Sequence, residues 1–152
     1  MVEKKRILIV DDDLEILRSL KSILEFKGYI VETAENGREA IEKSKVKFFN
    51  LALLDIKLPD MEGTDLLVKM HRTTPKVMKI MLTGYPTVEN AVKAVNLGAD
   101  AYIIKPVKPD ILLKVIEEKL KEQSEIESMS EEKVREWMET RLKKLESDES
   151  RE

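Results

Sequence analysis

Residues 51–63 read LALLDIKLPDMEG, and this stretch decides how the rest of the chain is interpreted. A short apolar run ends on the carboxylate of Asp55, and a loop rich in turn-forming residues follows. An apolar run of this length before such a loop is typical of a buried parallel strand. In an open α/β sheet, binding and chemistry occur at the carboxyl ends of the strands. Asp55 is therefore a candidate functional residue.

The composition restricts the class of protein. The chain has 152 residues, a net charge of −3 and no cysteine. It is long enough to bury the core of one domain, presents no overall basic field for nucleic acid, and has neither a disulfide framework nor a thiolate metal site. The apolar run at residues 7–10 is too short for a signal peptide or a membrane span. We expect a cytoplasmic protein that binds neither nucleic acid nor membranes.

Strand-like and helix-like segments alternate five times along the chain. Apolar or alternating runs predict strands at residues 7–10, 29–34, 51–54, 77–82 and 101–104. Apolar residues at helical spacing predict a helix after each strand, at about residues 16–27, 38–46, 63–71, 88–95 and 111–120. This alternation implies a parallel sheet with helices on both faces. We predict an α/β fold, a flavodoxin-like doubly wound sheet of five strands in the order 2-1-3-4-5.

Beyond the fifth predicted helix the composition becomes acidic and contains neither Gly nor Pro. We expect residues 1–122 to form the domain and residues 123–152 a helical tail that starts at Ser128 or Ser130 and is disordered from about Ser147. Its apolar residues recur every three or four positions beside Trp137: Val134, Met138, Leu142 and Leu145. The tail helix is therefore amphipathic, and two arrangements stay open: packing on the domain, or docking on another chain.

Polar residues follow four of the predicted strands: Asp11, Asp12 and Asp13, then Asp55, Thr83 and Lys105. In the predicted strand order these ends meet at one crevice. Crowded carboxylates raise one another's pKa unless a cation joins them, and an all-oxygen site without His or Cys favours Mg²⁺. A cation, a lysine, a hydroxyl and a nucleophilic carboxylate are the groups that phosphoryl transfer requires. We predict that Asp55 becomes an aspartyl phosphate and that Mg²⁺ is the cofactor.

Four segments in this order, ILIVDDD, LLDIKLPDMEG, MLTGYP and YIIKP, resemble the receiver domain of two-component response regulators over about residues 5–122. The resemblance is to a stand-alone, CheY-like receiver. It implies that Asp55 is the phosphoacceptor and that Asp11 and Asp12 bind Mg²⁺ together with Asp55. The backbone carbonyl of Lys57 would complete the protein's metal ligands.

The same resemblance assigns roles to residues after the later strands. Thr83 would hydrogen-bond the phosphoryl group, and Lys105 would pair with it. Tyr102 would be an aromatic switch that turns inward when Thr83 moves, and the peptide bond between Lys105 and Pro106 would be cis. Pro59 and Gly63 match the family's loop.

The resemblance implies a phosphorylation-dependent signalling switch that accepts a phosphoryl group from a sensor histidine kinase and changes protein–protein interactions. Such a domain is a regulatory phosphoacceptor and not an enzyme with an external substrate, although it supports its own phosphoryl transfer and autodephosphorylation. The downstream protein would bind the face formed by residues 88–95, 101–104 and 111–120, or the tail helix, and homodimer formation stays open. The alternatives are a phosphorelay intermediate and a constitutive protein-binding pseudo-receiver.

Other functions fit the sequence less well. The tail is too short for a DNA-binding domain. An ATPase would require a G-x-x-x-x-G-K loop, which the sequence lacks. A phosphohydrolase of the haloacid dehalogenase kind is disfavoured because Glu15 stands where Thr or Val is expected, and three aspartates after the first strand would repel a flavin phosphate. We interpret Asp13 as a helix cap and His71 as a solvated side chain, and expect Lys57 and Tyr85 at the mouth of the crevice.

Overall fold

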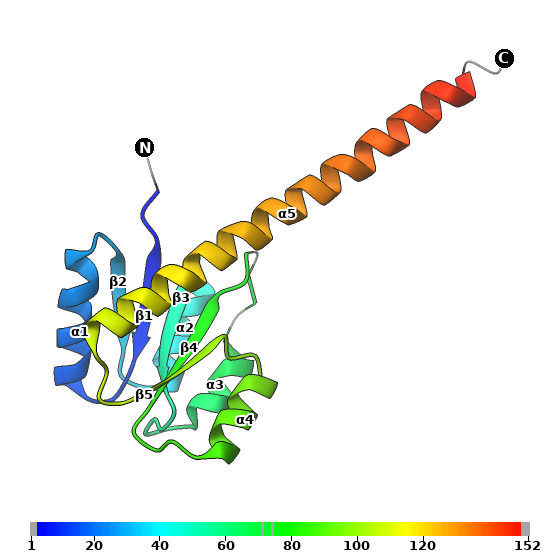
Figure 1. Cartoon of the computed structure of the whole chain (residues 1–152). Coiled ribbons are helices and arrows are strands. Elements are labelled where there is room, and N and C mark those ends of the chain that lie inside the picture. The colour runs from blue at the N-terminus through cyan, green and yellow to red at the C-terminus, as the bar shows by residue number, and fades with distance from the viewer. Residues whose placement is uncertain (1–2, 71, 74, 150–152) are drawn as a thin grey trace. The chain divides into compact units, whose positions relative to one another are not determined.

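The computed structural model describes residues 3–70, 72–73 and 75–149. In these residues strands and helices alternate five times, as predicted (Figure 1). In chain order the elements are β1 (Arg6–Val10), α1 (Leu14–Phe26), β2 (Ile30–Ala34), α2 (Gly37–Val46), β3 (Leu51–Asp55), α3 (Gly63–Lys69), β4 (Met78–Thr83), α4 (Val88–Asn96), β5 (Ala101–Ile104) and α5 (Pro109–Glu149).

The five strands form one parallel sheet in the order β2-β1-β3-β4-β5, which confirms the predicted fold class. Because successive side chains of a strand point to opposite faces, β1 serves two cores. Ile7 and Ile9 pack with residues of α1 and of the first part of α5, whereas Leu8 and Val10 pack with residues of α2, α3 and α4. The central strands are thus buried on both faces, as their unbroken apolar sequences require.

The loop between β1 and α1 shows how the sequence begins a helix beside the site. The carboxylate of Asp13 accepts hydrogen bonds from the backbone N–H groups of Glu15 at 3.0 Å and Ile16 at 3.4 Å. These donors have no partner inside the helix, so an N-terminal Asp stabilises its first turn. Asp13 is therefore a helix cap, as predicted. At the other end of α1, Gly28 follows with φ +95°, a conformation that favours glycine.

The described chain divides into two compact units, residues 1–120 and residues 121–152. α5 runs without interruption through Ser128 and Ser130 to Glu149, so the prediction that one of these serines starts a separate tail helix was wrong. Without Gly or Pro, no residue of this segment strongly opposes a continuous helix. The disorder expected from Ser147 is not seen up to Glu149, and residues 150–152 lie outside the described residues. No helix of the described residues has the length and apolar composition of a membrane span.

Candidate functional site

A pocket of about 660 Å³ opens where the loops after β1, β3, β4 and β5 meet. The sheet order places the ends of β1 and β3 side by side, with β4 and β5 next to β3. The topology therefore brings together residues that are up to 94 positions apart in the sequence. The pocket is lined by Asp11, Asp12, Asp13, Ile16, Asp55, Lys57, Leu58, Pro59, Glu62, Gly84, Tyr85 and Lys105.

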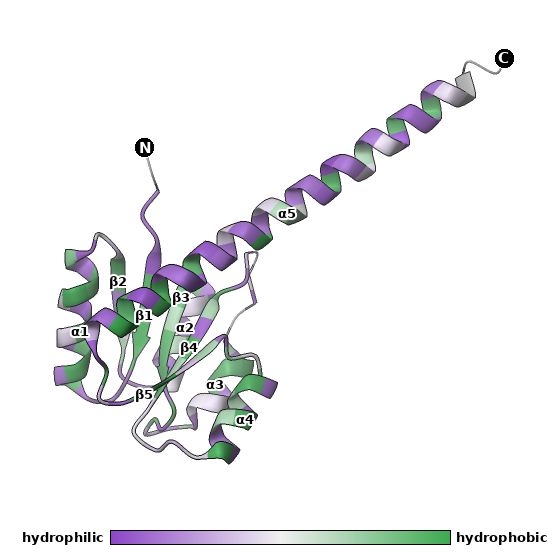
Figure 2. Cartoon of the chain, viewed as in Figure 1, coloured by the Kyte–Doolittle hydropathy of each residue, from purple (hydrophilic) through white to green (hydrophobic). Residues whose placement is uncertain are grey.

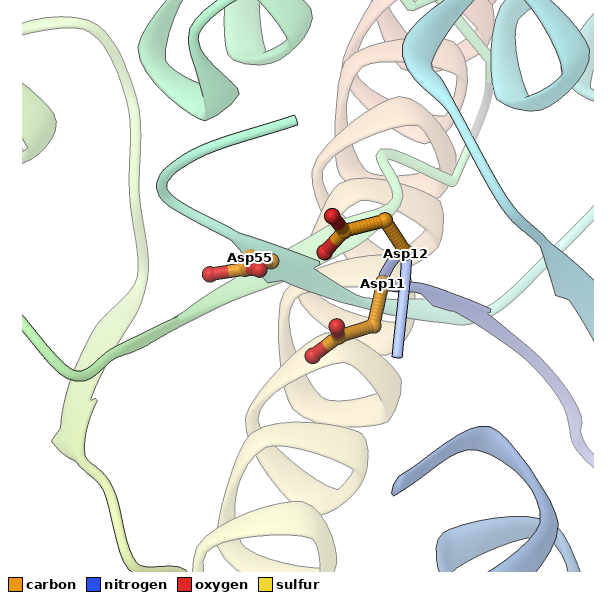
Figure 3. Close-up of side chains that lie close together, drawn as sticks. All are labelled: Asp11, Asp12 and Asp55. Atoms are coloured by element: carbon orange, nitrogen blue, oxygen red, sulfur yellow. The ribbon is translucent and has the colours of Figure 1, made fainter. Parts of the chain in front are cut away.

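Three carboxylates in this pocket lie close enough to hold one metal ion. Asp11 and Asp12 follow β1, Asp55 ends β3, and one oxygen of each lies within 4.8 Å of the others (Figure 3). Asp11 and Asp55 are buried, whereas Asp12 is exposed. One oxygen of Asp11 also accepts a hydrogen bond of 2.9 Å from the backbone N–H of Asp13, which fixes the direction of its carboxylate.

Lys105 brings a positive charge to two of these carboxylates. Its Nζ lies 2.8 Å from Oδ2 of Asp11 and 3.6 Å from Oδ1 of Asp55, and 18% of its side chain is exposed. Burial lowers the pKa of Lys105, but hydrogen bonding and the charges of Asp11 and Asp55 outweigh burial, so the pKa is raised from its ordinary value. Lys105 is therefore held in its charged form. The peptide bond between Lys105 and Pro106 is cis.

The charge of Lys105 does not compensate for all the negative charge around Asp55. The pKa of Asp55 is raised above its ordinary value, first by burial and then by the charge of Asp11, and the opposing effect of Lys105 is smaller than their sum. A carboxylate that is destabilised by a like charge gains from any further cation that enters the site. The all-oxygen donor set is the type that hard divalent cations prefer. The residues present therefore fit a divalent metal ion.

Thr83 and Tyr102 do not line the pocket. Thr83 is fully buried, and its Oγ1 accepts a hydrogen bond of 2.8 Å from the backbone N–H of Tyr85. The Tyr102 ring packs against the core cluster on the α2, α3 and α4 face of the sheet. Its hydroxyl is buried without a hydrogen-bond partner in the described part of the chain. An unpaired buried hydroxyl costs free energy, so a conformation that offers it a partner has an energetic advantage.

The mouth of the pocket carries a contact between two residues that the sequence placed there. The Nζ of Lys57 lies 4.7 Å from the centroid of the Tyr85 ring, in a cation–π arrangement. Both side chains are exposed, and both line the pocket. They come from the loops after β3 and β4, so their contact joins these two loops beside Asp55.

The loop after β3 contains three features that the sequence reasoning missed. Glu62 adds a fifth carboxylate to the pocket lining, after Asp11, Asp12, Asp13 and Asp55. Asp60 accepts hydrogen bonds of 2.9 Å from the backbone N–H groups of Gly37 and Arg38, so it ties this loop to the start of α2. A Cβ on Gly63 would lie 2.1 Å from the backbone oxygen of Asp55. The short loop and its acidic residues were visible in the sequence, but their partners come from distant elements.

His71, which the sequence analysis interpreted as solvated, lies outside the described residues. The other predicted residues fall into two groups. Those that line the pocket are Asp11, Asp12, Asp55, Lys57 and Lys105. Those that do not line it are Thr83, Tyr102, Pro106 and Gly63.

A doubly wound sheet with an acidic pocket and a paired lysine at its carboxyl edge places this chain among the α/β proteins whose binding site lies at the carboxyl ends of parallel strands. Residues 7–117 match the family model described as the response regulator receiver domain. This chain belongs to that family.

Individual relatives agree with this assignment. The chain is similar to the response regulator receiver domain protein (CheY-like) from Methanospirillum hungatei JF-1, with 59% identity and a TM-score of 0.78 over 81% of this chain and 98% of that one. A response regulator protein from Burkholderia pseudomallei, solved with a phosphorylated aspartic acid, calcium ion and citrate, is 28% identical with a TM-score of 0.69, over 84% of this chain and 75% of that one.

Curated relatives are longer proteins. The chain is 37% identical over 118 residues to the transcriptional regulatory protein ZraR of Klebsiella oxytoca. The matched region covers 78% of this chain and 27% of that relative. The chain thus spans about a quarter of the length of the first curated relatives that it matches.

Proposed function

We propose that this chain is a phosphorylation switch of a two-component system, in which Asp55 accepts a phosphoryl group from the phosphohistidine of a sensor kinase. One observation carries the proposal: the buried carboxylate of Asp55 faces an open pocket while Lys105 and the Asp11–Asp12 pair converge on it. Family membership supports it. The chain would act as a regulatory phosphoacceptor in the cytoplasm, and not as an enzyme with an external substrate.

Mg²⁺ is the metal ion that we assign to the acidic cluster. Asp11, Asp12 and Asp55 would hold it, and the backbone carbonyl of Lys57 would be a further ligand. Bound there, the ion would neutralise negative charge on the carboxylates and on the incoming phosphoryl oxygens. The Burkholderia relative was solved with a calcium ion, also a hard cation, and a phosphorylated aspartic acid, which supports this assignment.

The chain's own residues then have distinct roles in the transfer. An oxygen of Asp55 attacks the phosphorus atom, a P–O bond forms, the P–N bond to the kinase imidazole breaks, and its electron pair stays on the imidazole nitrogen. Lys105 keeps its positive charge and moves its contacts from the two carboxylates toward the phosphoryl oxygens. The hydroxyl of Thr83 accepts a hydrogen bond, so its own proton is available for donation to the phosphoryl group.

The readout would pass from Thr83 to Tyr102. A shift of Thr83 toward a phosphoryl group would change the space available beside β5. Because the Tyr102 hydroxyl has no hydrogen-bond partner in its present position, a second position of the ring in which the hydroxyl is hydrogen-bonded would be favoured. The surface that changes is the face of α4, β5 and the first turns of α5. That face offers exposed apolar side chains to a downstream protein: Val88, Val92, Val95, Ile104 and Ile111.

The kinase must bring its phosphohistidine to Asp55, so it must cover the rim of the pocket. A neighbouring groove of about 590 Å³ between α1 and the loop after β5 shares Asp13, Ile16 and Lys105 with the pocket. Its apolar lining suits a helix of a partner: Leu20, Ile23, Pro106 and Val107. We assign the kinase contact to this groove, which leaves the α4 face and the C-terminal helix for a downstream protein.

Mass spectrometry after incubation with acetyl phosphate and Mg²⁺ tests the phosphoacceptor. We expect one phosphoryl group, stable in acid and labile in base, that is lost in Asp55→Asn and absent when EDTA replaces Mg²⁺. Asp13→Asn is the matched control, because Asn also caps a helix, and it should keep the adduct. An adduct that persists in Asp55→Asn contradicts the site assignment. Failure of the unaltered chain to react would favour the pseudo-receiver alternative.

Tyr85 is expected to influence the lifetime of the phosphoryl group. Its ring lies over the mouth of the pocket against Lys57, where it restricts the approach of water to Asp55. Tyr85→Ala should therefore shorten the half-life of the phosphorylated protein about two- to fivefold, a difference of less than about 1 kcal/mol in the barrier. Phosphate release after removal of the donor measures it, and an unchanged rate would remove this role. A long lifetime in the unaltered chain would favour a phosphorelay intermediate.

A further inference from the structure

The loop of residues 56–62 carries a proposed metal ligand whose position only the backbone can set. In the proposed function, on which the present inference rests, the carbonyl oxygen of Lys57 binds Mg²⁺. A carboxylate can change rotamer to reach an ion, whereas a carbonyl oxygen moves only with its peptide plane. β1 and β3, which lead to the carboxylates, are hydrophobic over most of their length and largely buried (Figure 2). The core therefore fixes the ends of these strands, but the loop beyond Asp55 needs contacts of its own.

Backbone pairing closes the base of this loop. The N–H of Gly63 donates a hydrogen bond of 2.7 Å to the backbone oxygen of Ile56, and Lys57 pairs with Glu62 in an antiparallel bridge. Residues 58–61 lie between these pairs and form the tip of a small hairpin. A hairpin of this size has little stability alone, so the position of its tip depends on contacts with the rest of the protein.

Asp60, at the tip, makes such a contact with both of its carboxylate oxygens. Oδ1 accepts a hydrogen bond from the N–H of Gly37 and Oδ2 accepts one from the N–H of Arg38, each of 2.9 Å. These are the first two N–H groups of α2, and such groups have no partner inside their own helix. Hydrogen bonds from a helix N-terminus to a carboxylate are strengthened by its charge. Two bonds from one carboxylate therefore fix the tip against the start of α2.

Met61 makes a second contact between the loop and the same end of α2. A Cβ on Gly37 would meet the Met61 side chain, so that side chain lies directly against the helix backbone. Asn36 caps α2 independently of the loop, because its side chain accepts a hydrogen bond of 2.8 Å from the N–H of Glu39. The contact made by Asp60 therefore restrains the loop at least as much as it supports the helix.

We propose that Asp60 is a positioning residue for the metal site, and that it keeps the loop ordered so that the carbonyl group of Lys57 is in place before the ion binds. Without this contact, binding of the ion would have to order the loop, at a cost in conformational entropy. Metal affinity would fall for that reason, although Asp60 touches neither the ion nor the phosphoryl group. Because coupling is reciprocal, bound Mg²⁺ would in turn strengthen the contact between Asp60 and α2.

Titration of the full chain with MgCl₂, followed by the NMR shifts of backbone amides, tests this role. We expect the dissociation constant of Mg²⁺ to be about tenfold larger in Asp60→Ala. Asp60→Asn keeps one side-chain oxygen as an acceptor, so its affinity should lie between the two, and it carries the test if Asp60→Ala melts below the titration temperature. Glu42→Gln removes an exposed acidic charge beside Arg38 without touching the loop, and should bind like the unaltered chain.

Salt separates positioning from a simple effect of charge. Loss of an acidic residue also weakens the attraction of a cation from a distance, but about 0.5 M KCl screens that attraction. The tenfold ratio between Asp60→Ala and the unaltered chain should therefore persist at about 0.5 M KCl. A ratio that disappears at high salt would overturn the positioning role.

Hydrogen exchange of the α2 amides tests the reciprocal effect. Saturating Mg²⁺ should slow exchange at Gly37 and Arg38 in the unaltered chain, and should have no such effect in Asp60→Ala. The amide of Glu39, which is bonded to Asn36, is the internal control and should be unchanged by Mg²⁺. Exchange at Gly37 and Arg38 that does not respond to Mg²⁺ in the unaltered chain would contradict the coupling.

Failure of this inference differs from failure of the proposed function. If the unaltered chain binds Mg²⁺ and both Asp60 variants bind it equally well, the positioning role alone is wrong. If the unaltered chain binds no Mg²⁺, or if Asp55→Asn does not weaken binding, the metal assignment is wrong and the positioning role with it.

Discussion

Lys105 and Lys79 lie at opposite ends of the same sheet, and both side chains are largely removed from water. At the carboxyl end, Lys105 faces the carboxylates of Asp11 and Asp55, and its pKa is raised. At the amino end, Nζ of Lys79 donates a hydrogen bond of 2.6 Å to the backbone oxygen of Leu67. Its pKa is lowered by burial and by the nearby charge of Lys76. Burial lowers the pKa of both lysines, and only the carboxylates beside Lys105 reverse the direction of the net shift.

The difference extends to the other polar residues at each end. At the amino end their side chains hydrogen-bond to backbone N–H groups. Asp100 accepts a hydrogen bond of 2.8 Å from the N–H of Lys79, and Asn50 accepts one of 2.9 Å from the N–H of Arg6. At the carboxyl end, carboxylates face one another across an open pocket. Polar groups that are satisfied by backbone stabilise a fold, whereas uncompensated charge facing solvent space is a feature of functional sites. Four predictions test this contrast.

The largest expected effect concerns the approach of Gly63 to the site. In Gly63→Ala the new Cβ would meet the backbone of Asp55 and Ile56, which cannot move aside as a flexible side chain can. We expect a loss of about 3 kcal/mol or more in the free energy of unfolding. Gly84 lines the pocket, but a Cβ there would have no atom within 4 Å. Gly84→Ala should stay within about 0.5 kcal/mol of the unaltered chain in urea titrations, and equal losses would refute the explanation.

The second prediction compares the two lysines directly. Lys105→Met removes the cation that faces Asp55 and should slow phosphorylation by acetyl phosphate about 100-fold. Lys79→Met replaces a buried lysine, whose charge is disfavoured by burial, with an apolar side chain of similar length. It should leave the phosphorylation rate within about twofold of that of the unaltered chain. Its free energy of unfolding should change by no more than about 1 kcal/mol in either direction. If both variants lost phosphorylation to a comparable extent, the two ends of the sheet would not differ in function as we infer.

The third prediction concerns the charge of Asp55 in the absence of metal. Its pKa is raised in the folded chain, so between pH 3.8 and that pKa the folded state binds more protons than the unfolded state. Stability due to this group is therefore complete below pH 3.8 and is lost as the pH rises through the folded pKa. In EDTA at pH 7, Asp55→Asn should be more stable than the unaltered chain by roughly 1 kcal/mol.

Thermal melts of both proteins between pH 3.5 and pH 8, all in EDTA, measure this effect. The advantage of Asp55→Asn should shrink as the pH falls and vanish in acid. Saturating Mg²⁺ should raise the melting temperature of the unaltered chain more than that of the variant. An advantage that is independent of pH would show that the charge of Asp55 is not its cause.

The smallest effect is expected at Asp60. The backbone N–H of Gly37 and that of Arg38 lower the pKa of Asp60. Stability from this group is present above pH 3.8 and is lost as the pH falls through the lower, folded pKa. Asp60→Ala should cost about 1 kcal/mol at pH 7. Glu42→Ala, which breaks only the exposed ion pair with Arg38, should cost less than about 0.5 kcal/mol. Equal costs would show that Asp60 does not hold α2.

Much of the fold followed from local patterns. The apolar run before Asp55 predicted a buried parallel strand, and all five residues of β3 are buried. The error came at Ser128 and Ser130, which can cap a helix but do so only where the chain enters one. Here the preceding residues are already helical, so their carbonyl groups accept the hydrogen bonds that a cap would have provided.

The sequence by itself determined which side chains are available at the strand ends and that a parallel sheet would gather them. Only the tertiary structure decided that Asp11 takes the closer contact with Lys105, that Thr83 is fully buried, and that Gly63 lies against the backbone of Asp55. Those relations depend on distances between segments that are far apart in the chain, and the packing of the sheet and its loops sets them.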